Sequence, residues 1–162
     1  MLGKFLGCWL ACGLCLLVFY VFFGVVCGLR EHHWPVTQYF QAMWLHWCLL
    51  AVVTAMTLFG SVVFAAPSST NTIILVAVTG ILLLGRHLHK ISTSMSEPAA
   101  TILAVCYYTM PHLEFYDVRD LIIHDWPVIA WWVWGAATLY GIGYTALFLF
   151  AAWLKFRRQA LN

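Results

Sequence analysis

Long runs of hydrophobic residues alternate with short polar segments along this chain. A transmembrane helix needs about 20 apolar residues to cross a hydrocarbon core of about 30 Å. Four runs fit a membrane span, and they cover residues 5–28, 38–66, 72–90 and 127–154. The third run is apolar only to Gly85, but the long side chains of Arg86 and Lys90 can reach back to the membrane surface.

A shorter apolar segment lies between the third and fourth predicted spans. Proline is favoured at the first helical position, so Pro98 predicts the start of a helix over residues 98–110. This helix is too short to cross a bilayer and is predicted to be interfacial or re-entrant. The sequence therefore predicts an all-α polytopic membrane helical bundle. It has about four transmembrane helices and one short helix, in a single domain over residues 1–162.

The composition supports a lipid-facing surface. Of the 162 residues, 64% are hydrophobic and 9% are charged, whereas a soluble domain carries about 25% charged residues. The net charge of +2 and the absence of a basic run argue against nucleic-acid binding. Three of the six cysteines, Cys8, Cys12 and Cys15, share one helix face and are interpreted as packing residues.

Charged residues predict the topology. With a cytoplasmic N-terminus, Lys and Arg number four on each side, so the positive-inside rule alone does not decide. All six acidic residues then lie outside, and the densest basic cluster lies at the C-terminus. We therefore expect a multi-pass protein of the inner (plasma) membrane, with a retained first span and both termini in the cytoplasm.

Small residues in the last span indicate helix packing. In lipid, helices associate through close contact rather than through the hydrophobic effect. Gly135, Gly141 and Gly143 are accordingly predicted to lie against neighbouring helices.

Catalytic and nucleotide-binding motifs are missing from the sequence. It contains no G-x-x-x-x-G-K-[ST] phosphate loop, no H-E-x-x-H and no G-x-S-x-G. The prediction is a protein that is not an enzyme and has no cofactor. Histidines leave one alternative open, a haem- or copper-binding membrane redox protein that uses His46 and the outer-face histidines. In the competing interpretation, His46 forms a hydrogen bond to a neighbouring helix. The outer-face histidines are His32, His33, His87, His89, His112 and His124.

The segment from Tyr107 to Asp117 resembles a known stretch of sequence. It is similar to the Leu-Pro-Asn-Leu-Glu-Leu-Phe-Asn stretch of membrane subunits in ABC-type exporters, the type 2 ABC permease family. Pro111, Leu113 and Glu114 match, and His112 replaces the asparagine. The opening residues 2–7 are similar to the family's entry into its second transmembrane helix, and the closing helix is similar as well.

This resemblance implies a permease component of an ATP-driven exporter. Its partners would be a separate ABC ATPase subunit and a second permease subunit, in a homo- or heterodimer within the lipid bilayer. The family's first helix and its amphipathic cytoplasmic segment have no counterpart here, so we expect a split or truncated permease or a start upstream of Met1. A scaffold that only assembles other subunits is a further interpretation. The candidate residues for an external gate or transport path are Glu97, Pro111, His112 and Glu114.

Overall fold

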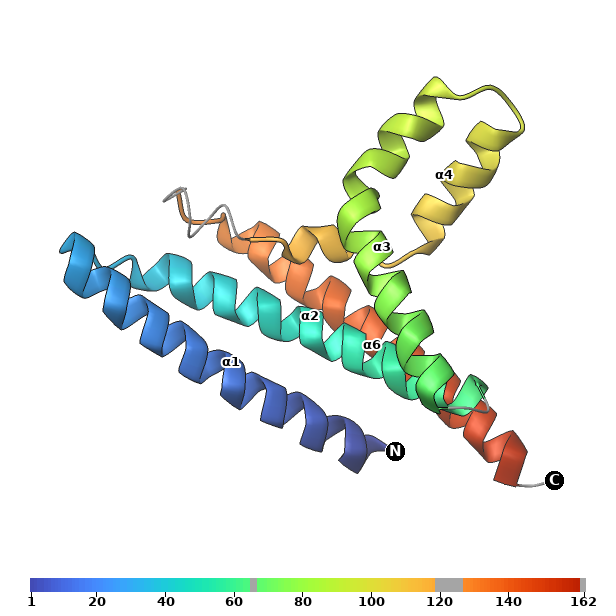
Figure 1. Ribbon diagram of the computed structural model, residues 1–162, viewed down its shortest axis with the longest axis horizontal. Helices are drawn as coiled ribbons and strands as arrows, with labels where there is room; N and C mark the ends of the chain where they lie inside the picture. The colour runs from blue at the N-terminus through green and yellow to red at the C-terminus, as the bar shows by residue number, and fades with distance from the viewer. Residues whose placement is uncertain (65–66, 119–126, 161–162) are drawn as a thin grey trace.

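The computed structural model describes residues 1–64, 67–118 and 127–160, which form helices and no strands (Figure 1). This confirms the predicted all-α helical bundle. The elements are α1 (Leu2–Glu31), α2 (Val36–Val63), α3 (Pro67–Ser94), α4 (Ala99–Thr109), the 3-10 helix η1 (Leu113–Tyr116) and α6 (Trp131–Ala160).

Three of these helices, α1, α2 and α6, are long and apolar enough to cross a membrane. They fit a multi-pass membrane protein. The predicted span 72–90 falls on α3, whose apolar part, Ser69–Leu83, is shorter. The side chains of residues 84–93 lie outside the described part of the chain, so the fourth crossing stays a prediction. Helix α4 corresponds to the short helix predicted over residues 98–110.

The turn between α1 and α2 is set by local backbone chemistry. His32 ends α1 in the left-handed conformation, with a φ of 54°, which is a common way for a helix to stop. Pro35 precedes the first residue of α2. A backbone N–H at this position has no partner within the helix, so the N–H that proline lacks costs no helical hydrogen bond. The chain therefore reverses direction within a few residues.

Helix α2 occupies the centre of the bundle. Across the most apolar 18 residues of each span, 33% are buried in α2, 17% in α6 and 6% in α1. Helix α1 runs antiparallel to α2, whereas α6 runs parallel to α2 (Figure 1). Both termini consequently lie at the same end of the bundle, and the α3–α4 hairpin branches away from it (Figure 1).

Small and polar residues of α2 determine how closely its neighbours approach. Ala51 and Ala55 are buried with Phe5 of α1 in one apolar cluster. Gln41 is fully buried, and its amide exchanges two hydrogen bonds of 2.9 Å with the backbone of Ile129. Because Ile129 lies just before α6, this amide fixes the start of α6 against α2.

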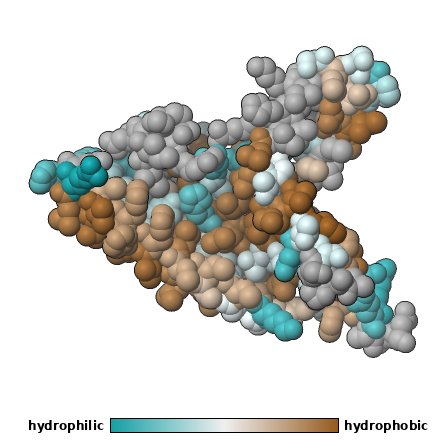
Figure 2. All heavy atoms as spheres, viewed as in Figure 1, coloured by the Kyte–Doolittle hydropathy of each residue, from teal (hydrophilic) through white to brown (hydrophobic). Residues whose placement is uncertain are grey.

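The outer surface of the bundle is banded. Figure 2 shows hydrophilic residues at its two ends and mostly hydrophobic residues between them. On α1, large apolar side chains such as Leu14 and Phe22 are more than two-thirds exposed. Such a surface suits hydrocarbon, because exposed apolar patches of this extent are rare on soluble proteins.

Candidate functional site

The segment after α4 folds into the bundle. Pro111, Leu113, Tyr116 and Val118 are buried there, and Leu113 and Tyr116 are completely covered. The segment is an inserted element that packs against α2, α3 and α6.

Tyr116 anchors this element at the middle of the bundle. Its hydroxyl donates a hydrogen bond of 2.7 Å to the carbonyl of Ala137 on α6. A Cβ added at Gly141 would lie 2.6 Å from that hydroxyl and 3.5 Å from the Cβ of Cys48. Gly141 therefore makes room for Tyr116. Burial raises the pKa of the Tyr116 hydroxyl above its ordinary value.

The predicted packing glycines of α6 differ in their surroundings. Gly141 is buried against Tyr116 and α2. A Cβ added at Gly135 or Gly143 would meet no described atom within 4 Å. The structure therefore gives a helix-packing contact to one of the three glycines within the described part of the chain.

Glu114 is the ionisable group at the centre of the site. Its side chain is 8% exposed, and its Oε1 lies 3.7 Å from Nδ1 of His112. The Tyr107 hydroxyl donates to the same oxygen over 3.4 Å. Among the described residues, Oε2 has no hydrogen-bond partner. A buried carboxylate usually satisfies both oxygens, so Oε2 is an open acceptor inside the protein.

Aromatic rings enclose this carboxyl group. The ring centroid of His112 lies 4.4 Å from that of Tyr107 and 5.3 Å from that of Phe115. The hydroxyl of Tyr140, on α6, accepts a 2.9 Å hydrogen bond from the backbone N–H of His112. We call Tyr107, His112, Glu114, Phe115 and Tyr140 the Glu114 cluster.

The Glu114 cluster is suited to binding rather than to covalent chemistry. The carboxyl group offers an acceptor, the His112 imidazole can donate or accept, and the rings present apolar faces. An ionisable residue within a membrane bundle typically marks a path for a substrate, an ion or a proton.

The structure brings three of the four predicted gate residues together. Pro111, His112 and Glu114 lie in one short segment, and their side chains are at least partly buried. Glu97 precedes the other end of α4, where it is exposed and accepts a 2.5 Å hydrogen bond from Thr101. The eleven residues of α4 separate it from Pro111, His112 and Glu114, a rise of about 16 Å.

His46 contacts a neighbouring helix. Its Nδ1 lies 2.5 Å from the Tyr20 hydroxyl of α1, in agreement with the hydrogen-bonded interpretation of this residue. It also lines a cavity of about 350 Å³ with Thr79 and Asp117. Within the described residues, no group of three or more His, Cys, Asp or Glu side chains could hold a metal ion. The side chains of His87 and His89, and all of His124, lie outside that set.

Sequence reasoning missed Tyr20, Gln41 and Tyr140. Each lies within a predicted span and makes a hydrogen bond to another element. The signal was present, because a polar group in an apolar helix normally faces protein rather than lipid.

No family model, curated protein or solved structure matches this chain.

Proposed function

We propose that this chain is a permease component of an ATP-driven exporter and acts with a separate ATPase subunit and a second permease subunit. The observation that supports the proposal best is the Glu114 cluster. The segment that resembles the permease stretch is the one that folds into the bundle and holds a buried carboxyl group there.

The position of the cluster suits a transport role. Tyr116, two residues after Glu114, packs between Cys48, near the midpoint of α2, and Gly141, about a third of the way along α6. Keeping a carboxyl group at this depth is costly, and a purely structural connector does not need one. A cargo group that donates to Oε2 would offset this cost during passage.

Energy for transport must come from another chain in this proposal. The sequence has no phosphate loop. The end of the bundle that carries both termini also carries Lys155, Arg157 and Arg158. We assign this end to the cytoplasmic side, where an ATPase subunit would dock.

The first test is purification of the full chain from its native membrane in mild detergent. We expect an ATP-hydrolysing subunit to co-purify, and a neighbouring gene should encode a phosphate loop. A monodisperse preparation with no such partner would contradict the proposal. A Soret band or stoichiometric copper in the same preparation would indicate the redox alternative instead.

The second test compares two carboxyl groups within the purified complex. Glu114→Ala should reduce ATP-dependent export while leaving the amount of protein in the membrane unchanged. Glu97→Ala tests the other candidate gate carboxyl group, which is exposed and far from Glu114; export unchanged from the wild type would remove Glu97 from the candidates. Export at the wild-type level by Glu114→Ala, with the partners still bound, would leave only the scaffold interpretation.

A further inference from the structure

A recess lies at the end of the bundle that holds both termini, where α1 begins and where α2 and α6 end. Its volume is about 620 Å³, within the range of about 300–1,000 Å³ typical of ligand pockets. Three polar side chains line it, Lys4 from α1, Ser61 from α2 and Gln159 from α6, and the remaining lining residues are apolar. We call this space the terminal recess.

The terminal recess carries a positive charge that no carboxylate nearby offsets. Lys4 is part of its lining. Helices α2, α3 and α6 contain no Asp or Glu, and the one acidic residue of α1, Glu31, is at the opposite end of that helix. The last turns of α6 add Arg157 and Arg158 to the same end of the bundle. The terminal recess is therefore suited to an anion.

A second recess, which is apolar, lies between the start of α1 and α6. Its volume is about 510 Å³, and its lining includes Gly3 of α1 and Trp153 of α6. A Cβ added at Gly3 would meet no described atom within 4 Å, so the space beside it is open. Met1 lines both recesses, which places them side by side. The guanidinium carbon of Arg157 lies 5.7 Å from the centroid of the Trp153 ring, so a second cation stands at the apolar recess.

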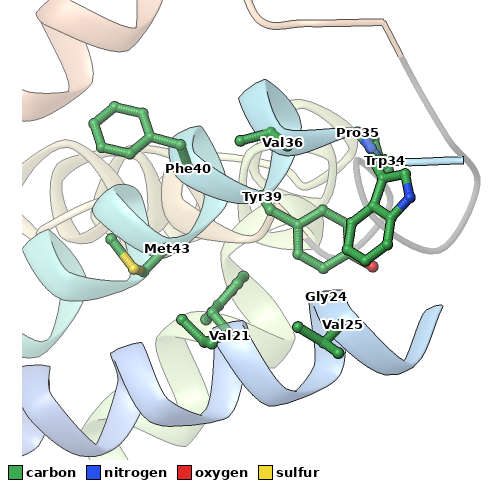
Figure 3. Close-up of a pocket in the computed structure, with 10 residues that line it drawn as sticks. Val21, Gly24, Val25, Trp34, Pro35, Val36, Tyr39, Phe40 and Met43 are labelled. Atoms are coloured by element: carbon green, nitrogen blue, oxygen red, sulfur yellow. The ribbon is translucent and has the colours of Figure 1, made fainter. Parts of the chain in front are cut away.

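The groove between α1 and α2 at the opposite end of the bundle provides a contrast. Its volume is about 360 Å³, and its lining residues, which include Val21, Tyr39 and Phe40, are all uncharged (Figure 3). Such a lining offers no charge that would distinguish one lipid head group from another. The terminal recess does offer one, in Lys4.

We propose that the two adjacent recesses hold an anionic glycerophospholipid, with its head-group phosphate against Lys4 and one acyl chain in the apolar recess beside Gly3. A lysine binds phosphate oxygens through charge-assisted hydrogen bonds, and basic pockets between transmembrane helices are typical sites for anionic head groups. A free anion or an acidic peptide would leave the apolar recess unfilled. The lipid would join the start of α1 to α6, whereas α1 otherwise packs mainly on α2.

The test uses the full chain in phosphatidylcholine nanodiscs with a trace of photoreactive lipid that carries a diazirine on one acyl chain. The photoreactive lipid is either phosphatidylglycerol or phosphatidylcholine, and mass spectrometry locates the labels after irradiation. In residues 1–4 and 149–153 we expect phosphatidylglycerol to label about fivefold more than phosphatidylcholine, the effect of about one basic side chain. In the groove of Figure 3 the two lipids should label equally.

Two pairs of variants separate the charge from the space. Lys4→Gln should reduce the preference for phosphatidylglycerol to below about twofold. Arg30→Gln is its matched control, because it removes the same charge from the opposite end of α1 and should leave the preference unchanged. Gly3→Leu places a side chain in the apolar recess and should lower labelling there by both lipids about fourfold, the factor for one buried methylene group. Gly7→Leu, on the same helix but in the lining of neither recess, should not lower it.

Equal labelling by the two lipids in the wild type, or a preference that survives Lys4→Gln, would overturn the proposal. Labelling that is the same in Gly3→Leu and Gly7→Leu would also overturn it, because the acyl chain would then lie outside the apolar recess. Loss of the preference when the chain is purified together with its protein partners would assign the terminal recess to an acidic segment of a partner instead of a lipid.

Discussion

Trp9 of α1 and Trp47 of α2 each donate an indole hydrogen bond to the backbone carbonyl of the other residue. The two distances are 3.0 and 3.3 Å, and the rings stack with their centroids 4.8 Å apart. The indole N–H groups find acceptors within the protein, which lipid cannot supply. This reciprocal pair joins α1 to α2, as does the hydrogen bond between Tyr20 and His46.

Gly13 is the residue that admits this pair. A Cβ added there would lie 2.3 Å from Nε1 of Trp47, so Gly13→Ala must displace the indole. We expect a loss of about 1–3 kcal/mol in the free energy of unfolding, as for other overpacked sites. Denaturant titration in mixed micelles measures it. Gly7→Ala on the same helix should be nearly neutral, and equal stabilities of the two variants would contradict the contact.

Gln41→Leu should weaken the attachment of α6. The substitution removes both hydrogen bonds to Ile129 and leaves its backbone N–H and carbonyl without the amide. We expect the free energy of unfolding to fall by about 1–2 kcal/mol, which is the upper part of the range for polar contacts in membrane bundles. Limited proteolysis in detergent should cut faster just before Trp131. Gln38→Leu, at a half-buried position in the same helix, is the control; equally fast cutting in this variant would exclude a specific role for Gln41.

The spans could be predicted because hydrocarbon thickness sets a minimum apolar length. The predicted ranges 5–28 and 38–66 largely coincide with α1 and α2, and 127–154 begins four residues before α6. Between the first two spans, Pro35 and the polar residues before it interrupt the apolar run. Length and composition are properties of each segment alone, so the spans can be predicted without knowing which helices they contact.

Helix neighbours and the site were not predictable in this way. Lipid tails are as apolar as leucine, so an apolar pattern does not say which helix faces which. Nothing local in the sequence indicated that η1 would insert between α2, α3 and α6 and bury Glu114. That burial depends on Gly141, which lies far along the chain and makes room for Tyr116.

Tyr116→Phe should change how stability depends on pH. Burial raises the pKa of the folded Tyr116, so its contribution is complete below the unfolded pKa of about 10 and is lost as the pH rises above that value. Thermal melting in detergent at about pH 7 should show that the variant is less stable than the wild type by about 0.6 kcal/mol of unfolding free energy, because the hydrogen bond to Ala137 is missing. Above about pH 10 the variant should lose stability less steeply than the wild type. A constant offset at every pH would contradict the buried hydroxyl.

Labelling of introduced cysteines should place both ends of the chain on one side of the membrane. The six native cysteines are first replaced by alanine. In this background, Gly3→Cys and Gln159→Cys should react with an impermeant maleimide only after the cells are permeabilised. His32→Cys, in the opposite turn, should react in intact cells. Labelling of residues 3 and 159 on different sides would contradict the bundle in Figure 1.

The parallel pairing of α2 and α6 is secured at three levels. Gln41 holds the start of α6, the Trp44 indole donates to the Thr138 hydroxyl over 3.1 Å, and Gln159 reaches the Val62 carbonyl at the far end. The two helices are therefore held together along their whole length. In the proposed exporter we therefore expect α2 and α6 to stay together and α1 or the α3–α4 hairpin to move relative to them, with η1 between the pair and α3.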